Sequence, residues 1–247
     1  MELVSRYNPH ISVDCVVFGY ENNELKVLLI NRNEAGKSSE YPDKFKLPGN
    51  LIARKQTLSN SAKGVLQEYT GLTNIFLKQF EVFDDPNRLQ PKSDLEWLQV
   101  SSHTFVDRVI TIAYYSLIKI DESLQTELSK TYNAQWISVN EVPDLVFDHK
   151  LIIEKALDTL KRGFLTDPLC FELLPEKFTL NQLQSLYESV LGFDLDNRNF
   201  RKKIAKAKYI QALSEWEKDV SHRPSQLYFF DKTEFNNKEI QHTGLIV

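Results

Sequence analysis

Charged side chains that could do chemistry lie in two parts of this chain. The first is Glu68, in a segment (residues 48–72) that has the pattern of a strand, a turn and an amphipathic helix. A helix carboxylate can hold Mg²⁺, which prefers oxygen ligands. Val65 and Tyr69, which stand four residues apart on one face of this helix, are apolar, so the face that would carry further ligands lacks them. We therefore expect the segment to bind a ligand without hydrolysing it.

The second set of charges is basic and lies at residues 197–208. Phe200 and Ile204 point to one side of a predicted helix, and cations cover the other side. An amphipathic helix precedes it, with Thr179 as its N-cap and Gly192 as its end. Two helices joined by a short turn, the second one basic, form a helix-turn-helix, in which the second helix enters the major groove.

Two β-rich segments, residues 210–216 and 226–231, follow the basic helix and predict a hairpin that would form a wing. The loop between them adds Lys218 and Arg223. The residues that we expect to contact DNA are Arg198, Asn199, Arg201, Lys202, Lys206, Lys218 and Arg223. A basic helix face can also be solvated surface or meet an acidic protein partner. A preference for specific DNA sites over random DNA would separate these alternatives.

Residues 48–72 resemble the Nudix box. When the two are aligned through Gly71, only Glu68 retains one of the four box carboxylates, and the other three positions hold Gln56, Val65 and Tyr69. In the enzymes of that family these carboxylates hold Mg²⁺, which neutralises charge on a pyrophosphate. The resemblance therefore implies no catalytic residues, no metal and no cofactor. An active hydrolase that uses Glu68, Asp84, Asp85 and Asp107 remains the alternative.

The elements expected around the box are those of a Nudix α/β/α sandwich over residues 8–162. Strands are predicted at residues 14–18, 25–30, 106–118 and 134–137, with a hairpin turn at residues 21–24. A helix should begin at His149 and end near Arg162, with Gly163 as its terminator. The pair Asp148 and His149 is interpreted as a helix cap with a packed neighbour, without a catalytic role.

Residues 171–230 resemble the winged-helix module of the Nudix-related transcriptional regulators. The matching segments include residues 178–180, 183–188, 198–204 and 223–228, and residues 147–149 resemble a motif at the end of that family's sensor domain. The resemblance implies an α/β fold, with a Nudix-like α/β/α sandwich at residues 1–163 and a winged helix-turn-helix domain at residues 164–247. It also implies a homodimeric, effector-responsive repressor or activator that binds double-stranded operator DNA, and we expect the effector to release the DNA.

Composition agrees with two modules. A chain of 247 residues with 42% hydrophobic content can form two cores. No segment resembles a signal peptide or a membrane span, which favours a cytoplasmic protein without a membrane partner. Cys15 and Cys170 are too few for a disulfide framework. Because the net charge is −4, any site for a polyanion must be local.

The resemblance implies two effector classes, sugars and ADP-ribose. The loss of acidic residues from the box, and the similarity of residues 10–20 to arabinose-responsive members, favour a neutral sugar, with L-arabinose first. Sugar hydroxyls need converging donors and acceptors, for which we expect Arg32, Lys46, Glu68, Asp107 and Arg108. The alternative is an ADP-ribose-responsive regulator of NAD metabolism, in which the basic residues near the box, Lys46, Arg54, Lys55 and Lys63, serve the diphosphate.

Overall fold

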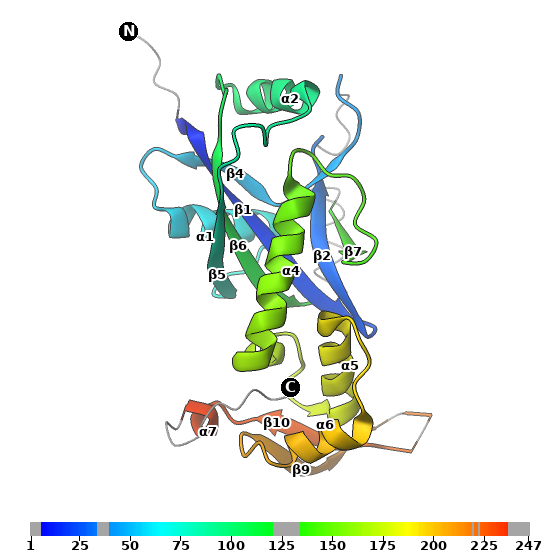
Figure 1. The fold of residues 1–247 in the computed structure, drawn as a ribbon. Helices are drawn as coiled ribbons and strands as arrows, with labels where there is room; N and C mark the ends of the chain where they lie inside the picture. Colours follow the sequence, from blue (N-terminus) through cyan, green and yellow to red (C-terminus); the bar gives the residue numbers. More distant parts are fainter. Residues whose placement is uncertain (1–5, 34–39, 121–133, 219, 222, 237–247) are drawn as a thin grey trace. The chain divides into compact units, whose positions relative to one another are not determined.

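The computed structural model describes residues 6–33, 40–120, 134–218, 220–221 and 223–236 (Figure 1). Two compact units divide the chain: Met1–Gly19 with Lys26–Leu157, and Tyr20–Leu25 with Asp158–Val247. This division falls inside helix α4 (His149–Thr166). The domain boundary that we expected after residue 163 stays a prediction. No helix within the described ranges is both long and apolar enough to cross a membrane.

The first unit is built on a mixed sheet with the strand order β3-β2-β1-β6-β5, in which β4 also pairs with β1 and β7 with β2. The turn between β1 and β2 has Asn22 and Asn23 at φ 52° and 62°, a left-handed conformation that asparagine tolerates in tight hairpins. The hairpin predicted at this position is confirmed. The strands are β1 (Tyr7–Glu21), β2 (Glu24–Asn31), β3 (Phe45–Lys46), β4 (Gly49–Ala53), β5 (Phe76–Phe83), β6 (Ile110–Lys119) and β7 (Gln135–Ser138).

Helix α1 (Leu58–Thr70) is the helix predicted from the box, and it packs on one face of the sheet. It begins at Thr57, whose hydroxyl accepts a hydrogen bond from the Asn60 amide, and it ends at Gly71 with φ 68°. Its apolar stripe joins a core with alternate residues of β1. This core includes Ala62, Val65, Leu66 and Tyr69 of α1 with Val13, Cys15 and Val17 of β1. The predicted apolar face is therefore confirmed as buried core.

Helix α4 crosses the sheet in Figure 1, and it buries Ile152, Ile153, Ala156 and Leu160. The prediction that Gly163 ends this helix is wrong, because the helix continues to Thr166. A Cβ atom at position 163 would lie 2.6 Å from Leu169 Cδ1. Glycine at this position therefore lets the side chain of Leu169 pack close to the helix, and it does not end the helix. Strand β5 and helix α2 (Lys92–Ser102) were not predicted.

The second unit contains two helices and a three-stranded sheet with the order β8-β10-β9. Thr179 and Gln182 form a capping box at the start of α5 (Leu180–Leu191), and Gly192 ends it at φ 82°. The predicted α5, its N-cap and its end are all confirmed. The other elements are the 3-10 helix η1 (Pro168–Glu172), β8 (Phe178–Thr179), α6 (Asn197–Ile204), β9 (Ile210–Trp216), β10 (Gln226–Phe230) and α7 (Lys232–Asn236).

The basic helix α6 is shorter than predicted. It was expected to reach Lys208 but ends at Ile204. Lys206 and Lys208 follow it in a turn that leads to β9, where the Lys206 amide bonds Lys203 O at 3.0 Å. The predicted wing is confirmed as the antiparallel pair β9 and β10. The last apolar residues of the chain, 245–247, lie outside the described residues.

Candidate functional site

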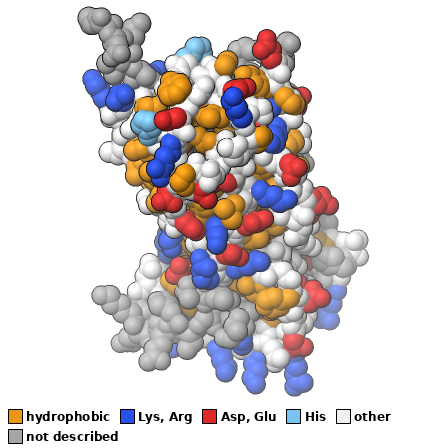
Figure 2. All heavy atoms as spheres, turned by 45° about the horizontal axis from the view of Figure 1, so that its top comes forward, with side chains coloured by type: hydrophobic (Ala, Val, Ile, Leu, Met, Phe, Trp, Pro, Cys, Tyr) orange, Lys and Arg blue, Asp and Glu red, His pale blue; other side chains and the backbone are white. Residues whose placement is uncertain are grey.

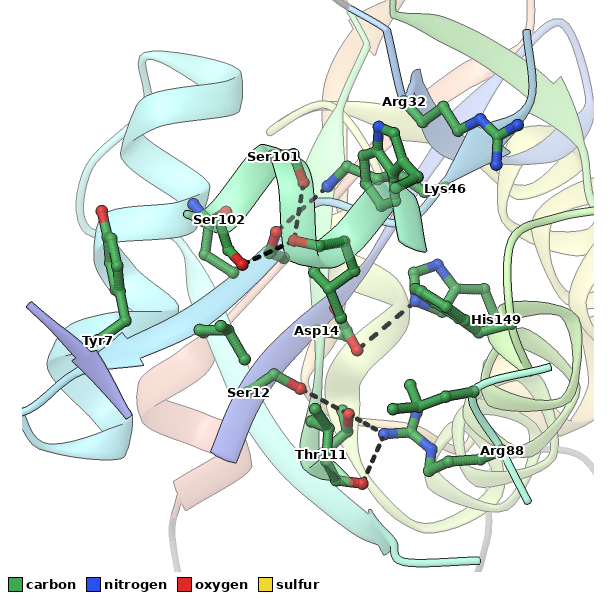
Figure 3. Close-up of a pocket in the computed structure, with 18 of the residues that line it drawn as sticks. Tyr7, Ser12, Asp14, Arg32, Lys46, Arg88, Ser101, Ser102, Thr111 and His149 are labelled. Atoms are coloured by element: carbon green, nitrogen blue, oxygen red, sulfur yellow. Dashed lines mark hydrogen bonds and ion pairs between the residues drawn. The ribbon is translucent and has the colours of Figure 1, made fainter. Parts of the chain in front are cut away.

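A pocket of about 440 Å³ opens in the first unit (Figure 3). Sites that enclose a ligand of drug or cofactor size are of this order. Its wall comes from β1, the turn between β3 and β4, β6, α2 and the start of α4. The lining combines aromatic groups with polar and charged ones: Tyr7, Tyr69, Trp97 and Phe147 with Ser12, Asp14, Arg32, Lys46, Arg88, Thr111 and His149.

Lys46 is the pocket cation that makes no ion pair within 4 Å among the described residues. Its Nζ donates to the backbone carbonyls of Leu47, at 3.3 Å, and Gly49, at 3.2 Å. The ammonium also lies 5.6 Å from the centroid of the Tyr69 ring. Burial lowers the pKa of Lys46 to about 8, against the attraction of Asp14 and Glu68. Lys46 is thus a desolvated cation to which an anionic ligand can bind.

Asp14 and His149 lie next to each other in the pocket. His149 Nδ1 accepts a hydrogen bond from the Leu47 amide at 3.0 Å, so the proton of the neutral ring is on Nε2. Nε2 is 3.7 Å from Asp14 Oδ2, too far for a hydrogen bond. Burial lowers the pKa of His149 to about 3 and raises the pKa of Asp14. A Cβ at Gly49 would lie 1.9 Å from Asp14 Oδ1, so glycine makes room for this carboxylate.

Arg88 is fixed by a two-point ion pair with Asp148, with distances of 2.9 Å from Nε and 2.7 Å from Nη2. The side chains of Arg88 and Asp148 are 3% and 16% exposed. Arg88 Nη1 also donates to the hydroxyl of Thr111, which lies 2.6 Å from the hydroxyl of Ser12. Asp148 directly precedes α4, so this ion pair connects the pocket wall to that helix.

Arg32 is held in the same way at another side of the pocket. Its Nη1 lies 2.6 Å from Asp94 Oδ1, and both side chains are almost fully buried. Asp94 also accepts from Lys44 Nζ at 3.0 Å. The guanidinium lies 5.9 Å from the centroid of the Trp97 ring. Asp94 and Trp97 are both on α2, so Arg32 connects this helix to the end of β2.

The pocket contains two of the five predicted effector residues, Arg32 and Lys46. Glu68 is exposed and does not line it, although its carboxylate accepts from Asn50 Nδ2, at 3.4 Å, on the rim. Asp107 and Arg108 are exposed and lie outside the lining. Asp107 is near His10, at 3.6 Å, and Arg108 donates to Asp84 O. For these two, the predicted contact with the effector stays a prediction.

Sequence reasoning missed Asp14 and Arg88 and saw only a helix cap in His149. The sequence could have indicated Asp14, because this residue interrupts an otherwise apolar strand segment (residues 13–18). A charged residue in a buried strand requires a partner or a function. Arg88 had none, since its partner Asp148 lies 60 positions away in the sequence. His149 had a signal, because residues 147–149 resemble a motif at the end of the sensor domain of the Nudix-related regulators.

The residues of the box do not fit the divalent metal of the Nudix enzymes. Three of the four carboxylate positions hold Gln56, Val65 and Tyr69, and Val65 and Tyr69 are buried in the core. Among the described residues, no cluster of three or more His, Cys, Asp or Glu side chains could hold a metal ion. We derive no metal-dependent step for this pocket.

The basic surface of the second unit is centred on α6. Its N-cap Asp196 accepts from the Asn199 amide at 2.8 Å, and Phe200 and Ile204 are its buried residues. The predicted DNA-contact residues are all exposed, both those on α6 and those beyond it: Arg198, Asn199, Arg201, Lys202, Lys206, Lys218 and Arg223. Lys and Arg side chains project from this unit at the lower edge of Figure 2. Exposed cations that are free of the core can meet phosphates.

Arg201 differs from the other cations of α6. Its Nε donates to Asn197 Oδ1 at 2.6 Å, and its Nη2 donates to Asn181 Oδ1 at 2.8 Å. It therefore connects the first turn of α5 to α6. Arg198 and Lys202, on the same exposed side, are available to reach a base or a phosphate.

Comparisons with known proteins agree with this architecture. Residues 170–230 match the family model of the NrtR DNA-binding winged helix domain. The chain is 28% identical over 229 residues to a protein of Acinetobacter baylyi described as an ADPR responsive transcriptional repressor NtrR, a match that covers 90% of this chain and 82% of that protein. The crystal structure of Shewanella oneidensis NrtR with a 27mer DNA has 24% identity and a TM-score of 0.67, covering 89% and 93% of the two chains.

A MutT/nudix family protein from Enterococcus faecalis has 23% identity and a TM-score of 0.60, with 90% and 88% of the two chains covered. The predicted fold, a Nudix-like α/β unit followed by a winged helix, is confirmed by these structures. The predicted sugar effector, L-arabinose first, is wrong, because the similar repressor is described as ADPR responsive. The similarity of residues 10–20 to arabinose-responsive members was misleading. The chain therefore shares the fold of the NrtR structures, and its residues 170–230 match the winged-helix domain of that family.

Proposed function

We propose that this protein is a transcriptional repressor that binds DNA through its winged helix and ADP-ribose through the pocket of its Nudix-like unit. The observation that carries the proposal is Lys46, a desolvated cation without an ion-pair partner among the described residues, inside a pocket of about 440 Å³. The description of the Acinetobacter baylyi relative as ADPR responsive supports the same ligand.

The pocket chemistry supports a ligand with both an anionic and an aromatic part. Lys46 can bind a diphosphate, because a cation in a desolvated site attracts an anion more strongly than one in water. Trp97 and Phe147, with ring centroids 6.5 Å apart, offer apolar surface to an adenine ring. A neutral pentose would use neither feature.

Binding without hydrolysis is part of the proposal. The hydrolysis of ADP-ribose by water would give AMP and ribose 5-phosphate, and it requires charge stabilisation at the pyrophosphate, which the carboxylate-bound metal supplies in Nudix enzymes. Here the box retains Glu68 alone. Incubation with ADP-ribose and Mg²⁺ should release no AMP above the uncatalysed background, measured by chromatography. Turnover of ADP-ribose would contradict this part.

Calorimetric titration tests the ligand. ADP-ribose should bind the wild-type protein, and a neutral sugar such as L-arabinose should not. Lys46→Gln should weaken ADP-ribose binding by about tenfold or more, since a charge-assisted hydrogen bond contributes roughly 1.5 to 3 kcal/mol. Lys119→Gln is the matched control, because Lys119 is exposed at the end of β6 and does not line the pocket. Equal losses in both variants would contradict the assignment.

The DNA-binding part rests on α6 and the wing. A duplex selected from a random pool by the wild-type protein should be bound in preference to unselected DNA, with an affinity that falls steeply with salt. We propose a homodimer as the binding form, because two recognition helices on a two-fold axis can address two half-sites. Light scattering on the free protein and on its complex measures this state. A monomer bound to the selected duplex would refute the dimer.

A further inference from the structure

The pocket contains a carboxylate that a diphosphate ligand does not explain. Asp14 lines the same pocket as Lys46, Arg32 and Arg88. A carboxylate repels a phosphate at short range, so Asp14 cannot be a phosphate contact. Its burial is unfavourable for the charged form and raises its pKa. Within the fold, the positive charges of Arg88 and Lys46 and a hydrogen bond with Thr111 favour the charged form of Asp14. A carboxylate has more acceptor sites than one hydrogen bond uses, and neutral hydrogen-bond donors on the ligand can occupy the others.

His149, which lies beside Asp14, indicates which kind of ligand group donates to this carboxylate. His149 presents Nε2–H to the pocket, because its Nδ1 is used by the Leu47 amide. The gap of 3.7 Å between Nε2 and Asp14 Oδ2 is too long for a direct hydrogen bond. A hydroxyl group donates one hydrogen bond and accepts others, so it can donate to the carboxylate and accept from the imidazole at the same time. Figure 3 shows these two side chains pointing toward each other.

In ADP-ribose, the hydroxyls that lie a few bonds from the diphosphate belong to its two riboses. We propose that Asp14 and His149 form a hydroxyl-recognition pair that binds a ribose hydroxyl of the ligand next to the diphosphate. Asp14 accepts from the hydroxyl, and His149 Nε2–H donates to it. This inference rests on the proposed function, because it assumes that the anionic part of the ligand binds at Lys46.

The replacement of Asp14 by asparagine should leave the fold intact. Asparagine has the same shape, so the packing against Gly49 is retained. The raised pKa of Asp14 means that the folded protein disfavours its charge, so removal of that charge does not cost folding stability. Thermal unfolding checks this directly. Asp14→Ser, which is smaller, provides a second variant if the asparagine protein does not fold.

The experiment compares three ligands on the full chain: ADP-ribose, ADP, and 2′,3′-dideoxy-ADP. ADP lacks the terminal ribose, and the dideoxy compound also lacks the hydroxyls of the adenosine ribose. In the wild type, either the step from ADP-ribose to ADP or the step from ADP to the dideoxy compound should lower the affinity by about tenfold or more. The reason is that a site that hydrogen-bonds a hydroxyl rejects an analogue without it. In Asp14→Asn that same ratio of affinities should fall to within about threefold of unity. If the ratio of the ADP-ribose and ADP affinities falls, the hydroxyl belongs to the terminal ribose. If the ratio of the ADP and dideoxy-ADP affinities falls, it belongs to the adenosine ribose.

A structural role for Asp14 would weaken all three ligands equally and leave both ratios unchanged, and that result would overturn the inference. Glu96→Gln is the matched control, since Glu96 is exposed on α2 and makes only a long contact with Lys92. It should leave both ratios at their wild-type values. If the wild type binds none of the three ligands, the proposed function itself fails. If it binds ADP-ribose but Asp14→Asn keeps both ratios, only the present inference fails.

Discussion

The pocket of the first unit and the basic helix of the second both present cations, but in opposite physical settings. Arg32 and Arg88 are buried and fixed by Asp94 and Asp148. The cations of α6 are exposed, and one of them, Arg201, donates hydrogen bonds to two asparagine side chains. Buried, fixed cations shape a site for one small ligand. Exposed cations suit a polyanion that is bound with a strong dependence on salt.

Ligand binding and folding stability make opposite demands on a cation in the pocket, but not on a cation of α6. On α6 an exposed cation costs little to keep, so its loss should affect DNA binding alone. In the pocket, Lys46 is held in a desolvated place where its charge is disfavoured. Its removal should weaken ligand binding and strengthen the fold. Substitutions in the two regions should therefore give different patterns of stability and binding.

The largest effect is expected at the pair of Arg88 and Asp148. Arg88→Ala leaves a largely buried carboxylate without its partner, which should lower the free energy of unfolding by about 3 to 5 kcal/mol. Urea unfolding measures this change. Arg108→Ala, at an exposed arginine, should change stability by less than about 0.5 kcal/mol. Equal stabilities of the two variants would mean that the pocket cations are no more constrained than surface ones.

Lys46→Met should raise the free energy of unfolding near pH 7 by on the order of 1 to 3 kcal/mol while it abolishes ADP-ribose binding. The sign follows from the pKa, which is lowered to about 8 in the folded protein from 10.5. The unfolded chain then binds more protons between these values. The gain should therefore be full below pH 8 and vanish as the pH approaches 10.5. Unfolding in urea at pH 7 and pH 10 checks it, and a less stable Lys46→Met at pH 7 would contradict it.

On the exposed side, Arg198→Ala should weaken binding to a selected duplex by about 1 to 3 kcal/mol more than binding to random DNA, if Arg198 contacts a base. Lys206→Ala should weaken both alike, as expected for a phosphate contact. Fluorescence anisotropy of labelled duplexes measures the four affinities. Lys232→Ala, at an exposed lysine on α7, is the control. Neither Arg198→Ala nor Lys206→Ala should change the thermal midpoint, in contrast to the pocket variants.

The smallest effect concerns the capping box that positions α5 before α6. Thr179→Ala removes the hydroxyl that accepts from the Gln182 amide at 3.1 Å. It should lower the free energy of unfolding by about 1 kcal/mol. Chemical denaturation followed by circular dichroism measures it. Thr179→Ser retains the acceptor and should recover most of the loss, and a serine variant as unstable as the alanine variant would argue against the cap.

The sequence predicted what depends on local patterns. The caps Thr57 and Thr179, the glycines that end α1 and α5, and the wing strands follow from short-range chemistry. The ends of α4 and α6 were misplaced because tertiary packing decides them: Gly163 is used for contact with Leu169, and the chain leaves α6 to form β9. Strand β5 (Phe76–Phe83) was missed because its apolar and polar residues do not alternate regularly, which gives a weak strand signal.

The site was harder to predict because its residues meet only in the folded chain. Lys46 and Arg32 were found because they lie beside a strand end or a turn, where ligands often bind. His149 reaches Leu47 across 102 positions, and Arg88 reaches Asp148 across 60, so no local pattern connects them. Asp107 and Arg108 were chosen for their place before a strand, but they are exposed and do not line the pocket. The effector was misjudged because the loss of carboxylates was equated with the loss of an anionic ligand.

The central claim is that the pocket senses ADP-ribose and thereby controls DNA binding, which requires the two ligands to favour different states of the protein. The most direct test is the anisotropy of a labelled, selected duplex bound to the full chain, titrated with ADP-ribose. We predict that ADP-ribose releases the duplex from the wild type and that Lys46→Gln stays bound at the same ligand concentration. A duplex affinity that is the same with and without saturating ADP-ribose would contradict the claim.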